Sequence, residues 1–332
     1  MPENIGTPAL WIGFGVFVLL MLALDLGVFH RQAHEVSYRE ALAWSLAWIT
    51  LALLFNAGIY HWFGRRAALE FLAGYVIEKS LSVDNIFVFV LIFSYFSVQR
   101  MYQHRILYWG ILGALLMRAA FILAGAVLLE TFHWIIYVFG AFLIFTGIRM
   151  LKGAEMEVHP ERNPVLRVFQ RLVPVDINYT GQRLIVRKEG RRYATPLLLV
   201  LVMVEATDVV FAVDSIPAIF AVTRDPFLVF TSNIFAILGL RALYFLLAGA
   251  IQQFSYLKFG LGLVLAFVGV KMSISGYLHI PIGLSLAVVA LVLGGSIALS
   301  FLRRPPPDAP AVPAEQDPPP ARPQELPSPS DP

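Results

Sequence analysis

The most informative feature of the sequence is a short acidic pattern that occurs twice within apolar segments. Each copy has an acid, five further residues, an aspartate, a small polar residue and an isoleucine: Glu78, Asp84 and Asn85 in the first, Asp208, Asp214 and Ser215 in the second. A charged side chain at the centre of a membrane helix costs about 3 kcal/mol on insertion scales, so such residues indicate function by default. Glu205 adds a fifth carboxylate to the same region.

Oxygen is the donor atom of this pattern. Carboxylates, the Asn85 amide and the hydroxyls of Ser82 and Ser215 suit magnesium, calcium or manganese and disfavour softer ions. Imidazole ligation is not expected, because the histidines at 30, 34, 61, 104, 133, 159 and 279 fall in predicted loops or near span ends. The residues alone therefore predict a hard divalent cation as substrate, with no resident cofactor.

A second interpretation of each acid is an ion pair that braces the helices. Lys79, Arg118 and Arg241 are the cations available inside predicted spans. Ion pairing competes evenly with a functional role for one carboxylate, but it accounts poorly for five, four of them at matching positions. Arg118 and Arg241 then serve to balance the carboxylate charge when the metal leaves. Asp25, near the end of the first span, is either a vestibule ligand or an interfacial residue.

The spacing within each pattern limits how both acids can act together. Residues six apart on a helix point about 120° away from each other. We therefore expect either a break in the helix within the pattern, or acids that serve different layers of a pathway. Pro217 in the second copy lacks the N–H that would bond the Val213 carbonyl, which favours a free oxygen beside Asp214.

The composition shows what must position these residues. The chain has 332 residues, of which 58% are hydrophobic and 14% charged, and it has no cysteine, so thiol chemistry is excluded. We predict an all-α, polytopic membrane helix bundle with about nine spans, because apolar runs approach the roughly 20 residues that cross a bilayer. The predicted spans are residues 8–29, 40–62, 68–97, 105–129, 132–151, 196–222, 227–250, 256–274 and 280–302.

Three ordered matches predict an internal repeat of three spans. Beside the acidic pattern, Arg118 in an apolar span matches Arg241, and the run from Gly147 to Met150 matches Gly269 to Met272. Units at about 68–151 and 196–274 with three spans each must enter the membrane from opposite sides. Inverted repeats of this kind hold substrate near the midplane and support alternating access.

The basic residues predict the orientation and the remaining organisation. Positive charge concentrates in the loop 152–195 and after residue 302, so both segments are expected in the cytoplasm and the N-terminus outside. Because the basic residues follow the topology, they give no support to nucleic-acid binding. Residues 183–194 predict a short hairpin in that loop. We expect residues 1–302 to form the transmembrane domain and the Pro-rich residues 303–332 to be a disordered tail.

Three long segments resemble the TerC family of membrane proteins, named for tellurium resistance. They are residues 78–88, 204–218 and 230–245, within a resemblance that extends from about Asp25 to Lys271. The resemblance implies a relation to the lysine-exporter superfamily and export of manganese across a bacterial inner membrane. The candidate metal ligands that it implies are Glu78, Asp84, Asn85, Glu205, Asp208 and Asp214.

Three functions remain open from the sequence, and none of them is enzymatic. The first is secondary transport of manganese, driven by proton exchange or by the membrane potential. The second is a membrane scaffold or assembly factor that acts indirectly in metal or tellurite resistance. The third is export of a small organic solute. Expected partners are the metal ion, the lipid bilayer, and a second copy of the chain or another membrane protein.

Overall fold

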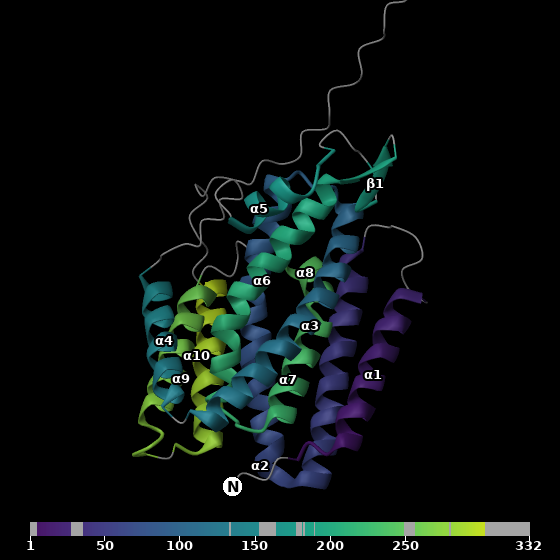
Figure 1. Cartoon of the computed structure of the whole chain (residues 1–332). Coiled ribbons are helices and arrows are strands. Elements are labelled where there is room, and N and C mark those ends of the chain that lie inside the picture. The colour runs from purple at the N-terminus through teal and green to yellow at the C-terminus, as the bar shows by residue number, and fades with distance from the viewer. Residues whose placement is uncertain are drawn as a thin grey trace, which may run out of the picture.

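The protein is a bundle of helices with one small hairpin at an end (Figure 1). The computed structural model describes residues 5–27, 36–132, 134–152, 164–176, 181, 183–188, 190–248, 256–278 and 280–302. Within them the helices are α1 (Pro8–Gly27), α2 (Tyr38–Tyr95), α3 (Arg100–Thr131), α4 (Ile135–Leu151), α5 (Pro164–Leu172), α6 (Pro196–Phe220), α7 (Pro226–Leu238), α8 (Leu240–Leu247), α9 (Leu257–Ile274) and α10 (Ile282–Leu302). The strands are β1 (Ile185–Lys188) and β2 (Arg191–Ala194). The predicted all-α membrane fold is confirmed.

Helix α2 contains two of the predicted spans. It has 58 residues, which at about 1.5 Å per residue is far longer than the roughly 30 Å core of a bilayer. Gly64 interrupts it with a φ of 85° and a ψ of 179°, a backbone conformation that favours glycine. The two helical halves on either side of Gly64 therefore correspond to the predicted spans 40–62 and 68–97.

Proline and side-chain caps define where the helices of the second predicted unit begin. The Thr195 hydroxyl oxygen accepts a bond from the Leu198 N–H at the start of α6. Asp225 accepts bonds from the N–H groups of Phe227 and Leu228 at the start of α7. Both helices have proline in their first turn, where the missing N–H is harmless.

A bend divides the predicted span 227–250 into two helices. Helices α7 and α8 meet at Gly239 at an angle of 41° and together are long enough for one broken span. Among the described residues five helices are long and apolar enough to cross a membrane, or six with this bent pair. The other predicted spans each coincide with a helix or part of one, while the number of crossings stays a prediction.

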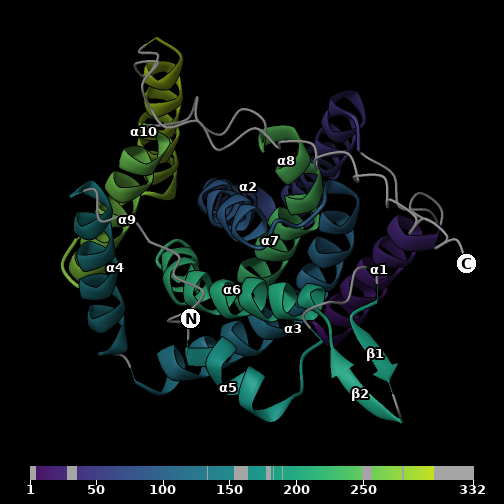
Figure 2. The same ribbon diagram turned by 90° about the horizontal axis from the view of Figure 1, so that it is seen from above.

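Helices α4, α9 and α10 stand together at one side of the bundle, as Figure 2 shows from above. Helix α4 packs along α9, and α9 packs on α10. Helices α1, α2, α3, α6, α7 and α8 form the other side of the molecule. We call α4, α9 and α10 the three-helix column.

The seam between α4 and α9 is made by glycines in reciprocal contact. A Cβ on Gly147 would lie 2.6 Å from the Gly262 carbonyl oxygen, and one on Gly262 would lie 3.0 Å from that of Gly147. Gly140 and Gly269 show the same relation, at 2.9 and 2.7 Å. Gly147 matches Gly269 in the repeat, and Gly140 and Gly262, seven residues earlier, match each other in the same way. The repeat therefore converts the contact of Gly147 with Gly262 into the contact of Gly269 with Gly140. A two-fold axis produces such reciprocity, which is the kind of contact an inverted repeat would make, and the repeat itself stays a prediction.

The long loop after α4 contains more structure than we predicted. The expected hairpin is confirmed, with β1 and β2 antiparallel and Gly190 at a φ of 80° in the turn. Helix α5 was not predicted, because its nine residues lack a span-length apolar run. The tail at 303–332 and the N-terminus at 1–4 lie outside the described residues, so their predicted disorder and location stay predictions.

Candidate functional site

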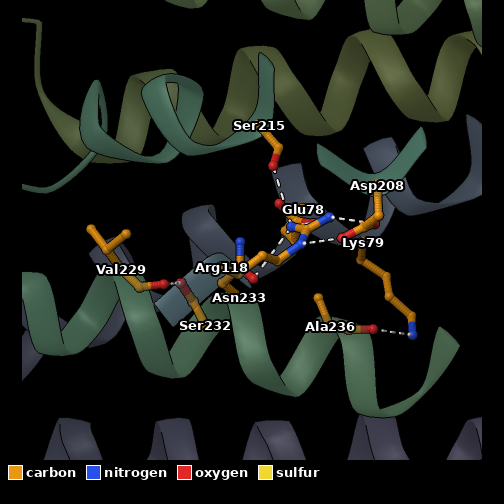
Figure 3. A network of polar contacts seen from close by, with 9 residues as sticks. All are labelled: Glu78, Lys79, Arg118, Asp208, Ser215, Val229, Ser232, Asn233 and Ala236. Carbon is orange, nitrogen blue, oxygen red and sulfur yellow. Dashed lines mark hydrogen bonds and ion pairs between the residues drawn. The ribbon is translucent and has the colours of Figure 1, made fainter. Parts of the chain in front are cut away.

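Arg118 of α3 lies at the centre of a buried polar network between α2, α6 and α7, drawn in Figure 3. Its Nη1 donates to Oε1 of Glu78, with which it forms an ion pair. Its Nε and Nη2 each lie 3.4 Å from a carboxylate oxygen of Asp208. Glu78 and Asp208 are the first acids of the two repeated patterns, so one guanidinium joins the two predicted units.

Two neutral side chains complete the coordination of Arg118. Its Nη1 also lies 3.2 Å from the Ser215 hydroxyl oxygen and 3.3 Å from the Asn233 amide oxygen. Arg118 and Glu78 are 1% and 0% exposed, so water screens the network little. The guanidinium and the two carboxylates carry a formal charge of −1, and the Lys79 ammonium lies within electrostatic range of Glu78.

Several buried polar atoms in this region have no hydrogen-bond partner among the described residues. They are Oε2 of Glu78, Oγ of Ser82 and Nδ2 of Asn233. Glu78 and Ser82 are four residues apart on α2 and therefore lie on the same face. Because a buried polar atom without a partner costs free energy, the two unbonded oxygens are suited to hold a water molecule or a cation.

The second acids of the patterns lie outside the Arg118 network. Asp214 accepts a hydrogen bond of 3.2 Å from the Thr146 hydroxyl of α4. Asp84 and Asp214 are both partly exposed, and their charges lie within electrostatic range of each other. Lys258 of α9 lies within range of Asp84, with its ammonium 5.1 Å from the centre of the Phe87 ring.

The structure thus divides the predicted ligands between two places. Both helices continue through the acidic patterns, and α6 contains Pro217 without ending there. Of our two expectations, a broken helix is therefore wrong and separate layers for the acids fit. Within the described ranges no three acidic or histidine side chains lie close enough to hold a metal ion. A single metal site around Asp84 and Asp214 stays a prediction.

Bracing by Arg118, our second interpretation of the acids, describes Glu78 and Asp208. The other two cations behave differently. Lys79 donates to the Ala236 carbonyl oxygen of α7 at 3.3 Å. Arg241 lies 3.1 Å from Nε2 of His104.

Of the remaining predicted residues, Asn85 is buried, and the side chain of Asp25 lies outside the described part of the chain. The carboxylate of Glu205 lies against the backbone of Gly113 in α3, where any Cβ would overlap it. Asn233, Thr146 and Gly113 were not predicted as site residues. Asn233 could have been recognised from the sequence because it lies in the segment 230–245 that resembles the family. Thr146 could have been recognised because it precedes Gly147, which belongs to the repeat.

Comparison with known proteins places this arrangement in a family. Residues 63–306 match the family described as "Integral membrane protein TerC family". A Myxococcus xanthus protein named "Uncharacterized membrane protein STKORF319" is 55% identical over 300 residues, covering 90% of this chain and 94% of that protein. An Escherichia coli K12 protein named "Putative membrane-bound redox modulator Alx" is 52% identical over 301 residues, covering 88% and 94%. No solved structure matches. The chain belongs to the TerC family of integral membrane proteins.

Proposed function

We propose that this protein is a secondary transporter that exports a hard divalent cation, manganese in the first place. The observation that carries the proposal is the pair of repeated acidic patterns, whose four acids lie in two adjoining places between α2 and α6. Oxygen donors and net negative charge within a membrane bundle suit a cation that prefers oxygen ligands. The choice of manganese rests on the family resemblance.

The two places have different chemical capacities. The Arg118 network carries an internal counter-charge, and Glu78 and Ser82 each have a buried oxygen without a partner. Among the described residues neither Asp84 nor Asp214 forms an ion pair within 4 Å of a cation, and Asp214 contacts the three-helix column through Thr146. We propose that Asp84 and Asp214 take the ion, and that Arg118 limits the cost of the neighbouring carboxylates when the ion is absent. Exchange for protons is the coupling we expect of such carboxylates.

A role in redox balance is the second candidate, because it is the name that several relatives bear. In this chain such a role would not use a thiol, since the sequence has no cysteine. A scaffold role makes the same prediction as an indirect redox role: neutralising one acid between α2 and α6 should leave function intact. The acids therefore separate these candidates from transport.

The test is the isosteric removal of one charge at a time. Cells that produce Asp84→Asn or Asp214→Asn should retain manganese, measured by elemental analysis of washed cells, and lose tolerance to it. Glu130→Gln is the matched control, because Glu130 is an exposed acid near the end of α3. Parallel loading with calcium and magnesium identifies the ion.

Protein abundance in the membrane must be measured beside the metal. Transport predicts normal abundance of both aspartate variants and lost efflux. If both variants are abundant and export manganese as the wild type does, the proposal is wrong. Loss of folded protein instead would show that these acids brace the bundle.

A further inference from the structure

A large cavity lies at the end of the molecule opposite α5 and the hairpin. Its volume is about 1180 Å³, and its walls come from the second half of α2, the connection 221–225, α9 and the start of α10. In Figure 1 the connections from α6 to α7 and from α9 to α10 lie at the lower edge, away from α5 and β1. We call this space the outer cavity, because the predicted orientation places that end outside the cell.

The outer cavity lies between the three-helix column and the rest of the bundle. Lys271 and Ser275 line it from the column, and Arg66 and Glu70 line it from α2. Glu70 accepts a 3.0 Å bond from Arg66 Nε and a 2.7 Å bond from the Thr223 hydroxyl. The walls also carry Arg224 and Asp225, so charged and hydroxyl side chains occur among the apolar ones and water can enter this space.

An apolar layer separates the outer cavity from the acids. Ile136, Phe220 and Met272 line the cavity and also belong to a buried hydrophobic cluster that continues into the bundle. Phe220 follows Asp214 by six residues on α6, about 9 Å along the helix. Along α6, Phe220 is therefore the last residue at the end that borders the cavity, and Asp214 lies further from that end.

Helix α4 of the three-helix column contacts α6 nearer the α5 end. The Thr146 hydroxyl of α4 donates to Asp214 of α6. Thr146 lies ten residues beyond Ile136 on α4, about 15 Å nearer the α5 end. The three-helix column thus lines the outer cavity opposite α2 and also contacts α6 nearer the α5 end, where Thr146 bonds Asp214.

We infer that the outer cavity is the exit vestibule of the transport path, and that Ile136, Phe220 and Met272 form the gate between it and Asp214. This inference rests on the proposed export of a hydrated divalent cation. The ion leaves Asp214 when the gate side chains separate, and passes Glu70 and Ser275 to the outside.

The absence of cysteine makes the inference testable by thiol accessibility in the full chain. Ser275→Cys places a thiol on the cavity wall, and Ser273→Cys is the matched control. The Ser273 hydroxyl donates to the Gly269 carbonyl oxygen at 2.9 Å and lies against Gly140, within the seam of α4 and α9. Spheroplasts producing either variant are treated with a charged, membrane-impermeant methanethiosulfonate, and both labelling and manganese efflux are measured.

Ser275→Cys should react from outside, at least tenfold faster than Ser273→Cys, and manganese efflux should fall once it has reacted. Labelling only after the membrane is permeabilised would overturn the inference, as would complete labelling with unchanged efflux. Labelling is measured on the protein and efflux on the metal, so the two failures are distinguishable. Absent manganese efflux in the untreated wild type would overturn the proposed function instead.

The gate has its own test in the same background. Asp214→Cys should be protected from the reagent added outside, and it should become reactive when Phe220→Ala and Met272→Ala are added. Equal reactivity of Asp214→Cys with and without the two gate substitutions would overturn the assignment of the gate.

Discussion

Replacing Arg118 by methionine removes the positive charge that Glu78 and Asp208 share. The three side chains are 1%, 0% and 5% exposed, so water cannot take over the role of the guanidinium. Removing one partner of a buried ion pair costs about 3–5 kcal/mol, because the remaining charge stays buried without compensation. Two carboxylates are left in this case, so we expect the free energy of unfolding to fall by the upper part of that range.

The size of this loss makes it measurable. At 1.4 kcal/mol for each tenfold change, a loss of about 4–5 kcal/mol lowers the folded population relative to the unfolded one by roughly three to three and a half orders of magnitude. Thermal unfolding of purified protein in one detergent, for wild type and Arg118→Met, provides the measurement. Arg105→Met is the matched control, because Arg105 is an exposed arginine on the same helix.

A second set of variants separates lost charge balance from lost packing. Adding Glu78→Gln and Asp208→Asn to Arg118→Met removes both uncompensated charges and should recover much of the stability. The reasoning is refuted if Arg118→Met unfolds at the wild-type temperature. It is also refuted if the two neutral substitutions lower the stability of Arg118→Met still further.

Three other predictions address packing, positioning and orientation. Gly147→Ala should lower the free energy of unfolding by about 1–3 kcal/mol, because its Cβ would meet backbone atoms of α9. Gly294→Ala is the control, because a Cβ there has nothing within 4 Å and should not destabilise the protein. Thermal unfolding measures both variants. Gly113→Ala should push the Glu205 carboxylate away from α3 and lower manganese efflux to the level of Glu205→Gln, at normal abundance in the membrane. A reporter fused after Arg304 should be active only in the cytoplasm, and activity outside would reverse the orientation and the assignment of the outer cavity.

The sequence predicted the helices well, because a membrane span requires a long apolar run and such a run can be recognised without knowing its tertiary contacts. Each predicted span coincides with a helix or part of one, except 227–250, which comprises α7 and α8. The turn at Gly64 was anticipated as a break between spans, but not as a single residue that leaves two helices in direct succession. Helix α5 escaped prediction because a nine-residue helix beside a membrane needs no apolar run.

The candidate site was harder to predict than the helices. Periodicity on one helix gives the direction of a side chain, but the partner across the bundle depends on how helices tilt and pack. Glu78 and Asp208 could be recognised as equivalent from the repeat, whereas their meeting at Arg118 depends on how far that side chain reaches from α3. Thr146 and Asn233 are small polar residues that acquire importance only through the acid or the arginine they touch.

The reciprocal glycines of α4 and α9 also say something about how such a chain can arise. Gly140 and Gly147 form the α4 side of the seam, and Gly262 and Gly269, which match them in the repeat, form the α9 side. A single ancestral unit inserted into the membrane in both orientations would already carry both surfaces of this contact, and two copies of it would dimerise through it. Joining two such genes would require a linker to fix the relative orientation, but no new interface between the halves.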